Sequence, residues 1–299
     1  MRREAILSPD VPPSIMGSHA VRAGGYVFLG GQIPSDYRNG LAPEVKKKRG
    51  IWVPAAASKH QSHYILENAQ KILKAAGSSL ELGVRIDQFC IHPDATSPYL
   101  EVRSRTINPE IRPCSTHVHI DSLLVPGALC GLWMIALTEE AGKSREMDTD
   151  FEADPGDSTG QGVKPSPLSH LGGSGGSARG QPTWMKAGDF VWVTGQVATD
   201  FQTGLAAEAR TNPAFWYGSP IKLQADFVLR QLKELLEDAG SSLGRVVRAD
   251  VYLTDMNDVY ELEEVWRKYF PESPPARTTI PMNRLAPKDC IIEINVIAL

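Results

Sequence analysis

The most constraining feature of this sequence is an internal repeat, in which two halves of the chain carry the same pattern. Four blocks match in one order, at spacings of 162 to 164 residues. They are VRAGGYVFLGGQIPSD (21–36) and MKAGDFVWVTGQVATD (185–200), Gly40-Leu41-Ala42 and Gly204-Leu205-Ala206, residues 75–80 and 238–243, and residues 109–137 and 271–299. Because chance does not produce ordered matches of this kind, the chain should fold as two copies of one unit.

Both copies show the same order of predicted elements. Apolar strands at 26–29 and 190–193 each end at a Gly-Gln pair, and a long helix follows that ends at Gly77 or Gly240. In the second copy the helix carries an apolar stripe made of Leu223, Phe227, Leu232, Leu235 and Leu236. A strand at 246–253, a helix at 259–270 capped by Asp255 or Asn257, and two closing strands complete the copy.

This order predicts the fold class and the domain boundaries. We expect an α+β protein with two β-β-α-β-α-β-β domains in tandem, with the helices on one face of each sheet. The domains are expected at 1–138 and 181–299, joined by a linker at 139–180 that is rich in Gly, Ser, Asp and Pro. Its glycine run at 171–177 lacks the Lys-Ser/Thr ending of a phosphate-binding loop, which favours a linker.

The composition narrows the class of protein. The chain has 299 residues, of which 42% are hydrophobic and 22% charged, values typical of soluble globular domains. A net charge of −4 and a pI of about 6.0 argue against nucleic-acid and anionic-membrane partners. The four cysteines lack Cys-x-x-Cys spacing, and we find neither a signal peptide nor an apolar run of membrane-spanning length. Buried thiols and a cytoplasmic location are therefore expected.

The last two predicted strands, 274–280 and 290–299, each contain one charged residue, Arg277 and Glu293. We expect these strands to form a hairpin with a turn at 284–289, in which an even register places both charges on one sheet face. Burying a lone charge is costly, so each charge needs a partner or a ligand. The two alternatives are a cross-strand salt bridge between these residues and a ligand-binding site.

Several motifs of the second copy form a recognisable set. They are Ala187-Gly188, Gly195-Gln196, Ala239-Gly240-Ser241-Ser242-Leu243, residues 251–258, Tyr269-Phe270-Pro271, Pro274-Pro275-Ala276-Arg277 and Ile292-Glu293-Ile294. With these motifs the copy resembles the Rid family, also called YjgF or endoribonuclease L-PSP, over about 115 residues. The first copy resembles it more weakly. The resemblance implies a chorismate-mutase-like fold, a homotrimer of two-domain chains, and pockets between neighbouring domains.

The resemblance also implies a reaction, the hydrolytic deamination of a small carboxylate-bearing enamine or imine without a cofactor or metal. Arg277 would bind the substrate carboxylate and Glu293 would position the attacking water, while Gly195, Thr279 and Asn257 line the pocket. Elementary chemistry agrees, because an arginine fork matches a planar carboxylate and a glutamate can hold a water and shuttle a proton.

The first copy departs from this pattern at the decisive positions. The gapless alignment puts Ser115 opposite Arg277 and Gly131 opposite Glu293, so we expect the imine-hydrolysing pair to be lost there. In exchange, this copy carries alternating residues that face one side of a strand: His117, His119 and Asp121. A degenerate structural copy is favoured over a modified pocket that includes Ser115 and the two histidines, and a metal site is least favoured.

The second copy departs as well. The family's tyrosine near the first strand is replaced by Gln181 or Pro182, and the loop before the first helix carries Phe215-Trp216-Tyr217. Loop aromatics either close over a substrate, with Trp216 as the candidate, or pack against a neighbouring domain. These departures favour a dedicated catabolic substrate that is larger than those of a general imine scavenger.

Two other functions compete with the deaminase. One is a non-catalytic regulatory protein whose pocket binds a carboxylate metabolite. The other is a ribonuclease, as the family's older name suggests, and the acidic pI and the absence of a clustered basic face in the sequence count against it.

Overall fold

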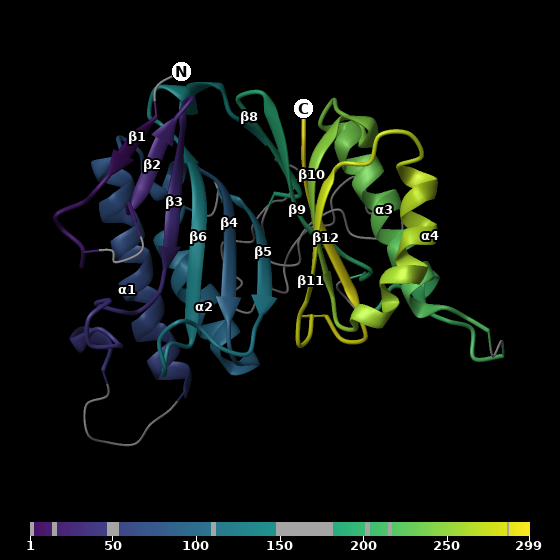
Figure 1. The fold of residues 1–299 in the computed structure, drawn as a ribbon, viewed down its shortest axis with the longest axis horizontal. Coiled ribbons are helices and arrows are strands. Elements are labelled where there is room, and N and C mark those ends of the chain that lie inside the picture. Colours follow the sequence, from purple (N-terminus) through teal and green to yellow (C-terminus); the bar gives the residue numbers. More distant parts are fainter. Residues whose placement is uncertain are drawn as a thin grey trace. The chain divides into compact units, whose positions relative to one another are not determined.

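The computed structural model describes residues 3–13, 17–46, 54–108, 112–147, 182–200, 204–214, 217–285 and 287–299. It divides into two compact units, Met1–Arg145 and Glu146–Leu299, which we call unit 1 and unit 2. Each unit contains one six-stranded sheet with helices on one of its faces (Figure 1). The predicted duplication and the α+β fold class are therefore confirmed.

Unit 1 has a mostly antiparallel sheet in the strand order β1-β2-β3-β6-β4-β5. Its strands and long helices are β1 (Glu4–Ile6), β2 (Ala20–Ala23), β3 (Tyr26–Gln32), α1 (Pro54–Ala75), β4 (Gly83–Cys90), α2 (Pro93–Thr106), β5 (Cys114–His119) and β6 (Cys130–Leu137). Short 3₁₀ turns lie at η1 (Pro43–Val45), η2 (Leu80–Leu82) and η4 (Ala141–Ser144).

Unit 2 repeats this topology in the strand order β11-β10-β12-β9-β8-β7. Its elements are β7 (Glu146–Met147), β8 (Trp184–Ala187), β9 (Phe190–Val197), η6 (Ala207–Ala209), α3 (Pro220–Asp238), η7 (Leu243–Arg245), β10 (Val246–Leu253), η8 (Met256–Asp258), α4 (Val259–Tyr269), β11 (Ala276–Pro281) and β12 (Ile292–Ala298). The predicted order of strands and helices is confirmed. The outermost strands β1 and β7 were not predicted, and β7 lies inside the expected linker, of which residues 148–180 fall outside the described ranges.

The predicted closing hairpin is wrong, because β11 and β12 are not neighbours. β10, α4 and β11 form a β-α-β crossover, which places β11 parallel to β10. β12 pairs antiparallel with the opposite edge of β10 and with β9. Ten residues separate β11 from β12, more than the two to five usual in a hairpin loop, and this length lets the chain pass β10.

Both strands end at or next to their Gly-Gln pairs, as the sequence suggested: β3 ends at Gln32, and β9 ends one residue further on, at Val197. The strand register shifts at Gly31-Gln32 and at Gly195-Gln196. In β9 the shift lies between Val193 and Gln196, so Gly195 belongs to a β-bulge. Bulges of this kind often lie next to functional sites, because they redirect the side chains around them.

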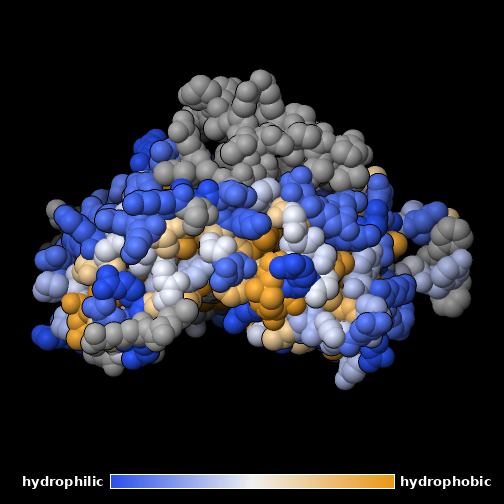
Figure 2. Space-filling model, turned by 90° about the horizontal axis from the view of Figure 1, so that it is seen from above, coloured by the Kyte–Doolittle hydropathy of each residue, from blue (hydrophilic) through white to orange (hydrophobic). Residues whose placement is uncertain are grey.

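The core of each unit lies between its helices and its sheet. In unit 2, four members of the predicted apolar stripe of α3 are buried, whereas Leu223 in the first turn is 37% exposed. The face seen in Figure 2 is mainly hydrophilic, and its apolar residues gather in small patches. Within the described ranges, no helix is long and apolar enough to cross a membrane.

Gly240 illustrates how the sequence ends a helix and provides a stability test. It follows α3 with a φ of +75°, and a Cβ added there meets nothing within 4 Å. Gly240→Ala should therefore destabilise unit 2 by about 1–2 kcal/mol through backbone strain alone. Urea denaturation measures this change, with Gly244→Ala, which has no positive φ, as the matched control. Equal urea midpoints for the two variants would contradict the claim that the positive φ at position 240 requires glycine.

Candidate functional site

The side chain of Arg277 projects from β11 toward helix α4. It shares a sheet face with its β10 partner Ala249, which lies in the core beneath the helices. The guanidinium carbon lies 4.7 Å from the ring centroid of Trp266, and Nη2 donates to Glu263. Both partners belong to α4, so the β-α-β crossover brings them to the arginine. The first candidate site is therefore a guanidinium stacked on an aromatic ring and paired with a carboxylate.

Arg277 has unused hydrogen-bonding capacity. Its Nη1 is buried, and none of the residues that the structure describes accepts a hydrogen bond from it. A buried donor without a partner costs about 1–3 kcal/mol, which a simple structural salt bridge does not explain. Thr279, two residues along β11, lies on the same face and is also half-buried. This surface offers a rigid cation with a free donor, which suits a planar anion.

Glu293 lies at the start of β12 and is buried, with 7% of its surface exposed. The Glu293 backbone pairs with Val197 of β9, and Ile294 pairs with Gln196, so the bulge at Gly195 lies on the adjacent strand. Burial raises the pKa of the nearby Cys290 thiol to about 12, and the negative charge of Glu293 adds to the shift. Cys290 is thus a protonated thiol at neutral pH and is unsuited to act as a nucleophile.

The prediction that Arg277 and Glu293 share one sheet face is wrong. Arg277 is opposite Ala249 on β10, whereas Glu293 is opposite Tyr252. Three residues along a strand reverse the face, and they correspond to about 10 Å along the strand, with about 10 Å more across the sheet. The cross-strand salt bridge is excluded for the same reason, and the ion-pair partner of Arg277 is Glu263.

Two other predicted pocket residues are Asn257 and Trp216, and the structure describes the first of them. Asn257 lies in the 3₁₀ turn η8 before α4, where its side chain is exposed and its backbone NH donates to Asp255 at 2.8 Å. Asp255 thus caps this turn rather than α4 itself. Trp216 lies outside the described residues, and its neighbour Tyr217 is 67% exposed.

The strand register of unit 1 supports the alignment of Ser115 with Arg277 and of Gly131 with Glu293. Ser115 is opposite Ile86 and Gly131 is opposite Phe89, the same register that Arg277 and Glu293 have in unit 2. A Cβ at Gly131 would lie 3.2 Å from the carbonyl oxygen of Gln32 and 3.3 Å from Ile33. Close packing therefore fills the space that a glutamate side chain would need.

The two histidines of unit 1 share one hydrogen-bond partner, the hydroxyl of Thr96. Nε2 of His117 and Nε2 of His119 lie 3.0 and 2.9 Å from the hydroxyl of Thr96 on α2, and the two rings meet edge to face. Asp121 lies past the end of β5 and is exposed. In the described part of the chain, no three His, Cys, Asp or Glu side chains gather as metal ligands do.

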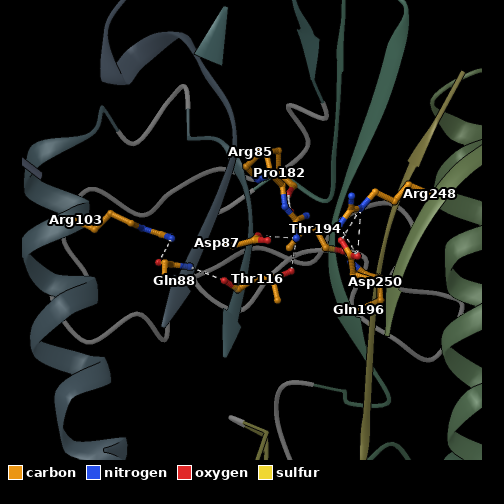
Figure 3. A network of polar contacts seen from close by, with 10 residues as sticks. All are labelled: Arg85, Asp87, Gln88, Arg103, Thr116, Pro182, Thr194, Gln196, Arg248 and Asp250. Atoms are coloured by element: carbon orange, nitrogen blue, oxygen red, sulfur yellow. Dashed lines mark hydrogen bonds and ion pairs between the residues drawn. The ribbon is translucent and has the colours of Figure 1, made fainter. Parts of the chain in front are cut away.

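The two units share one polar contact on their strands, and unit 1 has a further network of its own (Figure 3). In unit 1, Arg103 of α2 donates to the side chain of Gln88 at 2.5 Å, and Gln88 donates to the carbonyl of Thr116. Unit 1 therefore buries the guanidinium of Arg103 within a network of hydrogen bonds. An Arg-x-Asp ion pair occurs at the same place on the equivalent strands of the two units: Arg85–Asp87 in β4 and Arg248–Asp250 in β10.

Comparison with known proteins identifies the family. The endoribonuclease L-PSP model matches twice, at residues 12–137 and 181–299. The chain belongs to this family. A RutC family protein of Pyrococcus horikoshii is 42% identical over 114 residues, which cover 38% of this chain and 82% of the relative. Since L-PSP and Rid are two names for one family, the protein is a tandem two-domain Rid protein.

Two further Rid proteins carry more specific names. A 2-iminobutanoate/2-iminopropanoate deaminase of Salmonella typhimurium is 32% identical over 115 residues, covering 38% of this chain and 80% of its own. The crystal structure of RidA from the Antarctic bacterium Psychrobacter sp. PAMC 21119 is 32% identical and covers 39% of this chain and 85% of its own, with a TM-score of 0.32.

Sequence reasoning missed Glu263 and Trp266. They lie three residues apart on α4, a spacing that places both on one helix face. The sequence did contain a signal for them, because the expected helix at 259–270 comes directly before the strand of Arg277. A helix that connects two parallel strands packs back onto the sheet beside the second strand, so side chains of this helix could have been expected near Arg277.

Proposed function

We propose that unit 2 is a cofactor-independent hydrolytic deaminase of a small carboxylate-bearing enamine or imine. The observation that carries the proposal is the guanidinium of Arg277, which is stacked on Trp266 and keeps a buried donor without a partner among the described residues. Such a group is prepared for a carboxylate ligand. The Rid relative named as an imine deaminase supports this choice of reaction.

In the proposed reaction, Arg277 holds the carboxylate of a 2-imino acid, and Glu293 accepts a proton from the attacking water. The water oxygen forms a bond to the imine carbon while the nitrogen gains a proton. In the resulting carbinolamine the C–N bond breaks as a C=O double bond forms, and the hydroxyl proton leaves with the nitrogen. The products are a 2-oxo acid and ammonia, so imine and water are consumed in equal amounts.

Because Arg277 and Glu293 lie on opposite faces of one sheet, one pocket needs the two residues from different sheets. The imine carbon is bonded directly to the carboxylate carbon, so a small substrate does not span the separation within one sheet. We infer that the chain forms a homotrimer in which Arg277 of one chain faces Glu293 of another. A head-to-tail interface of this kind forms a closed ring when the rotation between neighbouring chains is one third of a turn.

The proposed function is tested by generating 2-iminobutanoate with a pyridoxal-phosphate threonine dehydratase and following ammonia release, with an aminomuconate-type substrate as a larger alternative. The expected result is faster release in the presence of the protein. Thermal stabilisation by 2-oxobutanoate without turnover of either substrate would instead indicate a binding protein and overturn the enzymatic assignment.

A further inference from the structure

Glu263 occupies the position at Arg277 that a carboxylate ligand requires. The ring of Trp266 covers one face of the guanidinium, so a hydrogen-bond acceptor must approach in the guanidinium plane. One of the in-plane donors, Nη2, already binds Oε1 of Glu263. The protein therefore supplies its own carboxylate to the site that is proposed to bind the substrate's carboxylate.

We propose that Glu263 is an internal competitor that sets the carboxylate affinity and selectivity of Arg277, an inference that rests on the proposed function. A substrate exchanges one charge-assisted hydrogen bond for another, and its affinity is the difference between the two. A simple carboxylate therefore gains little binding free energy when it replaces Glu263. Substrates that also contact other parts of the pocket displace Glu263, so the site selects for 2-imino acids with larger substituents.

A purely structural role for Glu263 makes a different prediction. If the ion pair only tied α4 to β11, the neutral isostere Glu263→Gln would keep a carbonyl acceptor for Nη2 and leave ligand affinity unchanged. The pair is more buried than a typical surface pair, with 19% of the Arg277 side chain and 32% of the Glu263 side chain exposed. The negative charge of Glu263 is therefore weakly screened and strongly repels any anion that approaches the same guanidinium.

The test measures 2-oxobutanoate binding by calorimetry and the kinetics of imine hydrolysis for the wild type and Glu263→Gln. We expect the variant to bind about threefold to tenfold more tightly, the range of a partly exposed ion pair, with a lower KM and an unchanged kcat. The matched control is Glu264→Gln, which breaks the neighbouring ion pair between α4 and Lys222 and should change neither quantity. Glu263→Ala also removes the negative charge and should likewise bind 2-oxobutanoate more tightly than the wild type.

Unchanged or weaker binding in Glu263→Gln overturns the inference. Weaker binding would mean that the charge of Glu263 instead holds Arg277 in the position that binds the ligand. The proposed function is judged separately through Arg277→Ala. If that variant loses binding and turnover while Glu263→Gln resembles the wild type, only the internal competitor is refuted. If the wild type neither binds 2-oxobutanoate nor hydrolyses the imine, the proposed function fails as well.

Discussion

Arg277→Ala is expected to reduce kcat/KM for imine hydrolysis by on the order of 10²–10⁴, because two charge-assisted hydrogen bonds to the substrate carboxylate are lost. Binding of 2-oxobutanoate should fall in parallel, since the same bonds hold the product. Steady-state ammonia release and calorimetry measure the two effects. Loss of the stack on Trp266 should also lower stability, by about 1 kcal/mol, so a melting curve must accompany the kinetics.

The matched control for this variant is Arg267→Ala. Arg267 lies one residue after Trp266 on α4, but its side chain is exposed. It has the same charge and a similar place in the sequence, and it should retain the wild-type rate. An Arg277→Ala variant that folds and hydrolyses the imine at the wild-type rate would refute the role of Arg277.

Glu293→Gln is expected to act on a different step. The isosteric amide keeps the size of the buried side chain but does not accept a proton from water. We therefore expect kcat to fall by about 10²–10⁴ while 2-oxobutanoate affinity changes little. Single-turnover measurements of the imine separate the two quantities. The control is Glu272→Gln, in the exposed segment before β11.

The outcome for Glu293→Gln distinguishes catalysis from architecture. Equal losses of binding and kcat would mean that Glu293 organises the pocket rather than activates water. An unchanged kcat would exclude it from the chemistry. Either result would leave the role of Arg277 intact, because the two residues belong to different surfaces of the sheet.

The internal repeat made the fold predictable. Each element is encoded twice, so the strands that begin at Tyr26 and Phe190 and the helix ends at Gly77 and Gly240 support each other. The strand pairing was not predictable from the same patterns. An apolar run indicates a strand but not its neighbour, and the choice between a hairpin and a crossover depends on how α4 packs against the sheet.

The candidate site was predicted in part. Arg277 and Glu293 were identified by their motifs and by the cost of charge within a strand. Their placement on opposite faces follows from the register through β10, which no local pattern reveals. Glu263 and Trp266 were missed because their role depends on a tertiary contact between α4 and β11.

The central claim is that unit 2 builds one hydrolytic pocket from Arg277 of one chain and Glu293 of another. Co-expression of Arg277→Ala and Glu293→Gln chains with different tags, followed by purification on both tags, isolates mixed assemblies. In each mixed trimer about one pocket in three receives both intact residues. We predict ammonia release at about a third of the wild-type rate from assemblies whose parent variants are inactive. Mixed assemblies as inactive as their parents would contradict the account.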